Sequence, residues 1–147
     1  MKRFKFKLER ILSLRKHVER QWENKLAEAT GKCVAIERQI NINLQRKAQE
    51  ITDRFARRLS VQELIASHLF TTRLDIENEE CEVELAERIR EREVVQDGYL
   101  NASKERKVLD KLKERRAEEN MRLQRSEDVK RIDDINMGRA ARKSTII

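Results

Sequence analysis

Proline is absent from all 147 residues, and this absence constrains the fold more than any other feature of the sequence. Because proline interrupts helices, a proline-free chain whose apolar residues recur every three to four positions is expected to form long helices. Charged residues make up 41% of the chain and aromatic residues 4%, so large apolar side chains are too few to build a globular core. We therefore expect the apolar stripes to meet each other along an extended seam.

The first 40 residues carry a stripe with coiled-coil spacing, in which Arg15 fills the one gap. Its apolar members are Leu8, Ile11, Val18, Trp22, Leu26, Ala29, Cys33, Ile36 and Ile40. Beyond it the expected stripe takes steps of mostly four, through Leu44, Ala48, Ile51, Phe55 and Leu59. Such a change of spacing relaxes left-handed supercoiling, so a nearly straight crossing is expected there.

The best interior signal for a helix start is Ser60-Val61-Gln62-Glu63. It has the capping-box form, in which a serine hydroxyl and a glutamate carboxylate satisfy opposite backbone N–H groups. The alternative is that Ser60 and Glu63 lie within one unbroken helix. An unbroken helix would leave its apolar stripe unpaired unless two chains dimerised, so we expect a turn.

After the turn the apolar positions resume. The expected second seam consists of Val61, Ile65, Leu69, Thr72, Ile76, Val83, Ala86, Ile89, Val95, Tyr99, Ala102, Leu109, Leu112 and Leu123. Gly138 lies beyond the last periodic residues and suits a helix C-terminus.

The sequence thus predicts an all-α fold, an antiparallel two-helix coiled-coil hairpin with unequal arms. One such hairpin would occupy residues 1–147, with a first helix over 4–58, a turn at 59–60, a second helix over 61–137 and a flexible tail over 138–147. Roughly 20 to 30 residues of the second helix would extend past the N-terminus without a partner, because antiparallel pairing matches equal distances from the turn.

The net charge of +7 is unevenly distributed. Residues 1–59 carry 16 Lys/Arg and 7 Asp/Glu (16 − 7 = +9), whereas residues 60–147 carry 18 and 20 (18 − 20 = −2). The run 75–97 is acidic, while the stretches 1–20 and 104–116 are basic and would meet at the open end of a hairpin. That end is either a docking surface for an acidic partner or an ordinary solvated face.

No nucleophile–base–acid set, glycine-rich phosphate loop or close carboxylate pair is recognisable, so we expect neither catalysis nor a cofactor. Two distant cysteines, Cys33 and Cys81, and two distant histidines offer no closely spaced zinc ligands, and no metal site is expected. The axial mismatch of the two thiols disfavours a disulfide. Neither a signal sequence nor a membrane span is recognisable, which fits a reducing cytoplasm.

Three further features concern packing. Trp22 is interpreted as a seam filler rather than a binding anchor. The isolated Gly31 and Gly98 are interpreted as tolerated defects or points of close helix approach. Phe70 and Leu74 lie four residues apart and either form a small apolar ridge on the outer flank or join the seam.

Three segments resemble the flagellar export protein family FliJ. The opening Phe4-Lys5-Phe6-Lys7-Leu8-Glu9-Arg10-Ile11-Leu12-Ser13-Leu14-Arg15 resembles the family's F-x-F-x-L-x-x-[IV]-L-x-L-R pattern. The stretch from Leu59 through Phe70 and Leu74 is similar to the start of the family's second helix. The segment 125–135, Arg-Ser-Glu-Asp-Val-Lys-Arg-Ile-Asp-Asp-Ile, is similar to its C-terminal E-x-K-x-L-D-[ED]-[IL] pattern.

The resemblance implies a non-enzymatic stalk and adaptor, similar to the central stalk subunit of rotary ATPases. Its open end would insert into a hexameric flagellar export ATPase, stimulate it, and link it to the membrane-embedded export gate. The resemblance further implies escort of export chaperones and a cytoplasmic location, peripheral to the membrane at the export apparatus. By position, Phe70 and Leu74 match the family's gate-binding patch, although Glu77 and Cys81 depart from it.

The basic open end and the resemblance lead to one hypothesis for the ATPase contact. The residues expected to face an acidic sleeve in the ATPase ring are Lys2, Arg3, Lys5, Lys7, Arg122, Arg125, Lys130 and Arg131.

Two alternatives of other classes stay open at this point. One is a basic coiled coil that binds nucleic acid, although base-reading side chains are not grouped ahead of a zipper. The other is a generic structural coiled coil that homodimerises through full-length helices.

Overall fold

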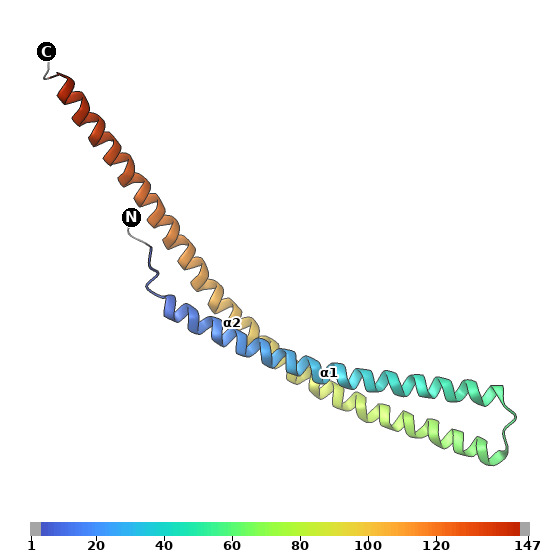
Figure 1. Cartoon of the computed structure of the whole chain (residues 1–147). Helices are drawn as coiled ribbons and strands as arrows, with labels where there is room; N and C mark the ends of the chain where they lie inside the picture. The colour runs from blue at the N-terminus through green and yellow to red at the C-terminus, as the bar shows by residue number, and fades with distance from the viewer. Residues whose placement is uncertain (1–3, 145–147) are drawn as a thin grey trace. The chain divides into compact units, whose positions relative to one another are not determined.

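The computed structural model describes residues 4–144, in which two long helices and no strand are present (Figure 1). Helix α1 spans Glu9–Ala56 and helix α2 spans Val61–Ser144. The two helices are antiparallel and pack against each other, which confirms the predicted all-α hairpin with unequal arms. The chain divides into two compact units. We call residues 18–102 the turn unit, and residues 4–17 together with 103–144 the terminal unit.

The helix ends differ from the expected bounds. Helix α1 begins at Glu9 rather than at residue 4, because the carbonyl of Leu8 accepts the first helical hydrogen bond, from the amide of Leu12 at 2.9 Å. It ends at Ala56, and the turn covers 57–60. Helix α2 continues beyond the expected end at 137 to Ser144. A glycine ends a helix by adopting a left-handed conformation, and no described glycine, Gly138 included, has a positive φ.

The capping box at the start of α2 is confirmed. The Ser60 amide donates to the Glu63 carboxylate at 2.7 Å, and the Glu63 amide donates to the Ser60 hydroxyl at 3.3 Å. These bonds, the one from the Ser60 amide above all, lower the pKa of Glu63 below its ordinary value. Two backbone donors that would otherwise lack a partner are thus satisfied at the first turn of α2.

In the turn unit, the first part of α1 follows the expected seam. Trp22 lies directly on Gly98 of α2, where an added Cβ would approach the indole ring to 2.5 Å. Gly98 is therefore a point of close helix approach, as one of the two sequence interpretations held. The half-buried indole also carries the Lys25 ammonium over its ring, 4.7 Å from the centroid. Cys33 is buried on the same seam, and both cysteines are free thiols.

Nearer the turn, the expected change to steps of four is wrong. The inward positions of α1 continue in the regular three-and-four spacing, and their occupants are polar or charged: Asn43, Lys47, Glu50 and Arg54. The apolar residues next to them point outward instead, and Phe55 is 85% exposed. Because α1 is continuous, the rotation fixed at Trp22 also determines which residues face α2 near the turn. These polar groups therefore point inward, although burial of the neighbouring apolar side chains would be more favourable.

Specific hydrogen bonds compensate for this polar seam. The Lys47 ammonium lies 2.6 Å from an Asp75 carboxylate oxygen, and the Arg54 guanidinium donates twice to the Ser67 hydroxyl, at 3.0 and 2.9 Å. A half-buried charge paired in this way avoids most of the cost of leaving water unpaired.

The first part of the expected α2 seam is also wrong. The residues that α2 buries before residue 80 are Ser67, Thr71, Leu74 and Asn78. The expected seam members there, from Val61 to Val83, are exposed: Leu69 is 62% exposed, Ile76 52% and Val83 65%. Ala86 is exposed as well, whereas Ile89 is half-buried, and from Val95 the expected and observed seams coincide, through Tyr99 and Ala102. The register explains the difference, because the contacts Lys47–Asp75 and Arg54–Ser67 present the polar face of α2 to α1.

The same register places Asn43 opposite Asn78. Both side chains are buried, and the Asn43 amide nitrogen and the Asn78 amide oxygen have no hydrogen-bond partner. The first is a donor and the second an acceptor, so the two unpartnered atoms are complementary in hydrogen-bonding character. A single buried asparagine layer fixes the register of coiled-coil helices at a cost in stability.

Gly98→Ala tests the close approach of the helices. The new methyl group must displace the Trp22 ring, so the free energy of unfolding is expected to fall by about 1 to 3 kcal/mol. Thermal and urea unfolding, followed by circular dichroism and tryptophan fluorescence, measures the change.

Gly31→Ala is the matched control. Nothing lies within 4 Å of the position of its Cβ, so this substitution is expected to stabilise the helix by about 0.5 to 1 kcal/mol. Equal effects of the two substitutions would contradict the contact between Trp22 and Gly98.

Candidate docking surfaces

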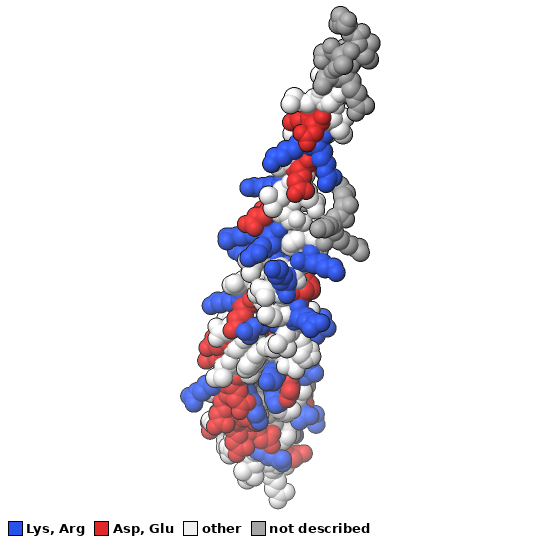
Figure 2. Space-filling view, turned by 90° about the vertical axis from the view of Figure 1, so that its left-hand side faces the viewer, with Lys and Arg blue, Asp and Glu red and all other residues white. Residues whose placement is uncertain are grey.

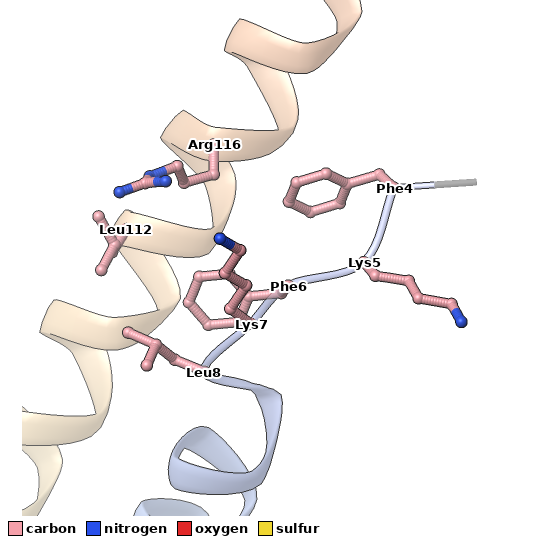
Figure 3. A pocket seen from close by; sticks show the side chains of 7 residues that line it. All are labelled: Phe4, Lys5, Phe6, Lys7, Leu8, Leu112 and Arg116. Atoms are coloured by element: carbon pink, nitrogen blue, oxygen red, sulfur yellow. The ribbon is translucent and has the colours of Figure 1, made fainter. Parts of the chain in front are cut away.

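The N-terminal segment of the terminal unit lies against α2. Figure 3 shows the rings of Phe4 and Phe6 and the side chain of Leu8 directed toward α2, near Leu112 and Arg116. Together with the lysines between them, these residues line a shallow pocket of about 320 Å³. The extended backbone of residues 4–6 permits this arrangement, because alternate side chains of an extended chain point to the same side.

The lysines of the same segment occupy the alternate positions. Lys5 and Lys7 are exposed, and Figure 3 shows Lys5 directed away from α2. The segment therefore combines an apolar side that lies on α2 with an exposed lysine, Lys5, that is directed away from it.

Ion pairs link the two parts of the chain within the terminal unit. Arg15, in the gap of the apolar stripe, pairs with Glu105, and Lys113 lies 2.8 and 2.9 Å from the two carboxylate oxygens of Glu9. The acidic side chains of Glu9 and Glu105 thus lie where the fold brings the two basic stretches together. The pairs are partly exposed, so each contributes only about 0 to 1 kcal/mol to stability.

Helix α2 continues beyond the N-terminal segment, and between residues 104 and 140 none of its side chains is buried. Apolar residues in this stretch are exposed as well: Met121, Leu123, Val129, Ile132, Ile135 and Met137.

Of the eight basic residues expected to contact the ATPase, six are described and all six are exposed: Lys5, Lys7, Arg122, Arg125, Lys130 and Arg131. All six belong to the terminal unit. Among the described residues, Arg125 donates only to the Met121 sulfur, at 3.6 Å. Lys2 and Arg3 lie outside the described residues.

The two residues expected to contact the gate are separated by their burial. Phe70 is 42% exposed, whereas Leu74 is 3% exposed and belongs to the seam of the turn unit. The prediction that both residues form an outer ridge is therefore wrong, because the packing of the helices directs the Leu74 side chain toward α1. Phe70 lies beside a shallow depression next to the turn, which Leu59, Ala66 and Ser67 also line.

Within residues 4–144, neither helix combines the length and the apolar character that a membrane span requires. Within the same range, His, Cys, Asp and Glu side chains form no group of three or more that would hold a metal ion.

Comparison with known protein families decides the identification. The model of the flagellar FliJ protein family matches residues 4–145, which is nearly the whole chain. The chain belongs to the flagellar FliJ family. Comparisons with curated proteins and with solved structures gave no significant match. Membership in the FliJ family makes this chain a component of the flagellar export apparatus.

The structure gives a physical reason for the opening pattern of this FliJ-family chain. Phe4, Phe6 and Leu8 contact α2, and Leu12 is buried four residues later. The pattern F-x-F-x-L therefore holds an extended segment against the second helix and starts the first. Sequence reasoning missed Leu112 and Arg116 as the residues beneath this segment, since only the pairing register brings them there.

Phe4→Ser with Phe6→Ser tests how the segment is held. Without its two rings the segment loses its apolar contact with α2, so cleavage by trypsin after Lys7 is expected to become several-fold faster. Mass spectrometry of the released peptides measures the rate.

Ile11→Ser is the matched control, because Ile11 is exposed in the same unit. It is expected to leave the cleavage rate unchanged. A double variant that is cleaved no faster than the parent chain would show that the two rings do not hold the segment.

Proposed function

We propose that this chain is a non-enzymatic stalk and adaptor of the flagellar type III export apparatus. Its terminal unit inserts into the hexameric export ATPase and stimulates it, and the chain links the ATPase to the export gate. Escort of export chaperones belongs to the same role. The proposal places the protein in the cytoplasm, peripherally at the membrane-embedded apparatus.

The main support for the ATPase contact is the exposure of the α2 side chains beyond Arg116. Between residues 117 and 140 none of these side chains is buried and most are exposed, so the apolar residues have no core to enter. A helix with this much exposed apolar surface gains stability from a partner that surrounds it. The interior of a protein ring is such a surrounding.

Charge supports the choice of an acidic sleeve. Arg122, Lys130 and Arg131 make no ion pair with any described residue, and Lys5 and Lys7 are exposed on the N-terminal segment. Acidic groups on the partner would steer the association and would be felt mainly at low ionic strength.

The gate contact is proposed for Phe70 alone. Phe70 is exposed beside the turn, while Leu74 is buried in the seam. A large aromatic ring at the surface is a common anchor of protein interfaces.

Charge reversal tests the ATPase contact. Lys5→Glu, Lys7→Glu, Arg122→Glu and Arg125→Glu, combined in one variant, should weaken binding to the cognate export ATPase by about tenfold or more. ATP hydrolysis and hexamer formation, measured against concentration of this protein at low and high salt, provide the readout. The parent chain should lose stimulation as salt rises, and the variant should show little of this dependence.

A matched control reverses four exposed basic residues outside the proposed contact: Arg20, Arg38, Arg46 and Arg58. This control should stimulate the ATPase normally, and Phe70→Ala should do so while losing affinity for the gate. Unchanged stimulation by the first variant excludes the proposed contact, and an equal loss in both variants shows a dependence on net charge only.

A further inference from the structure

The outward face of α2 in the turn unit carries an exposed apolar stripe that packs against no other described part of the chain. Leu69, Ile76 and Val83 recur every seven residues, and all three are more than half exposed. Ile65 and Thr72 fill the alternate positions, so the spacing is four and three. The Thr72 hydroxyl donates to the His68 carbonyl at 2.9 Å, which leaves its methyl group to the surface. We call these five residues the outer stripe.

The spacing of the outer stripe is that of a coiled-coil seam. A helix face in contact with water needs no such regularity. A second helix that packs along α2 needs it, because the side chains of that helix enter holes that α2 residues form at these intervals. The shape of the expected occupant is thus helical rather than extended or flat.

The next position of this spacing is occupied by Glu79, between Ile76 and Val83. Its carboxylate is exposed and makes no hydrogen bond or ion pair with any described residue. A helix packed on the stripe would cover this carboxylate, and a covered carboxylate without a partner is costly. A lysine or arginine on the occupant removes that cost.

Acidic residues also flank the stripe. In heptad terms, Glu80 and Glu87 lie on one flank and Glu82 lies on the other. Arg73 shares the flank of Glu80, and its guanidinium is paired with Glu77 at 2.9 Å. The three glutamates are exposed and unpaired within residues 4–144. Figure 2 shows acidic side chains gathered near the lower end of that view, at the height of the first half of α2.

We propose that the outer stripe is a docking site for a basic amphipathic helix of another protein. That helix carries aliphatic residues at its seam positions, Lys or Arg at the flanking positions, and one Lys or Arg opposite Glu79. A second copy of this chain is a poorer occupant, because its stripe brings four more unpaired glutamates and a single flanking arginine, Arg73, which is already paired with Glu77.

This site is distinct from the surfaces of the proposed function. The ATPase residues belong to the terminal unit, and Phe70 lies between the outer stripe and the seam rather than on the stripe. The site can therefore fail its test while the ATPase contact stands, and the reverse also holds.

The test uses the full chain and two synthetic probe helices of four heptads each. Both probes have Leu at the seam positions; the basic probe has Lys at the flanking positions and at one seam position, and the acidic probe has Glu at all of these. Calorimetric titration is expected to show binding of the basic probe, weakened by salt, and at least tenfold weaker binding of the acidic probe.

The apolar contact is tested with Leu69→Gln, Ile76→Gln and Val83→Gln in one chain. Affinity for the basic probe is expected to fall about a hundredfold. The matched control, Met121→Gln, Leu123→Gln and Val129→Gln, changes three equally exposed residues of α2 in the terminal unit and should bind the probe as the parent chain does.

Charge selection is tested with Glu79→Lys. This variant should bind the basic probe about tenfold more weakly than the parent chain and bind the acidic probe more tightly than the parent chain does. Circular dichroism of each variant establishes that helix content is retained.

Three results would overturn the proposal. The first is full affinity of the stripe variant for the basic probe. The second is equal binding of the two probes, which would indicate adhesion without charge selection. The third is a dimer of this chain in sedimentation that the stripe substitutions dissociate, which would assign the stripe to a second copy.

Discussion

The contact of Trp22 with Gly98 sets the facing of both helices, and the rest of the turn unit depends on it. The indole leaves no room for a Cβ on the opposite helix, so α1 and α2 meet at one rotation and one register. Each helix is continuous through this unit, and the facing chosen there extends to the turn. The consequence is a seam that is apolar at one end of the unit and polar at the other.

The polar part of the seam has a structural use. Lys47 with Asp75 and Arg54 with Ser67 make geometrically specific contacts, and slipping either helix would break them. An apolar seam tolerates slippage more easily, because its contacts are less directional. The polar seam thus fixes the register of the two arms near the turn, while the apolar residues beside it become available to other molecules.

The two units therefore present different surfaces. The terminal unit exposes basic side chains and the unpaired apolar residues of α2. The turn unit exposes Phe70 and the outer stripe, which is apolar and has acidic residues beside it. The proposed adaptor role would benefit from sites of unlike chemistry, because each site then rejects the partners of the other.

The sequence predicted the fold well and the facing of its helices only in part. The absence of proline and the capping box at Ser60 were sufficient for two helices and a turn. The seam from Trp22 to Ile40 was also predictable, because apolar residues occupy it without competition. Near the turn two stripes compete, and apolar periodicity favours Ile76 and Val83 over the polar positions that the structure buries.

The choice between these stripes depends on contacts distant in sequence. No local signal shows that Gly98 must lie under Trp22, and that contact determines which stripe faces inward. Among the candidate site residues, the exposure of the basic side chains could be predicted from their charge. The difference in burial between Phe70 and Leu74 could not, because it depends on how α1 and α2 pack.

The central claim is that the register places Leu74 inward and Ile76 outward. Urea unfolding of Leu74→Ala and Ile76→Ala tests it most directly, because the two substitutions remove similar apolar volume two residues apart. Leu74→Ala is expected to lower the free energy of unfolding by about 2 to 4 kcal/mol, and Ile76→Ala is expected to change it by no more than about 0.5 kcal/mol. A larger loss for Ile76→Ala than for Leu74→Ala would contradict the central claim.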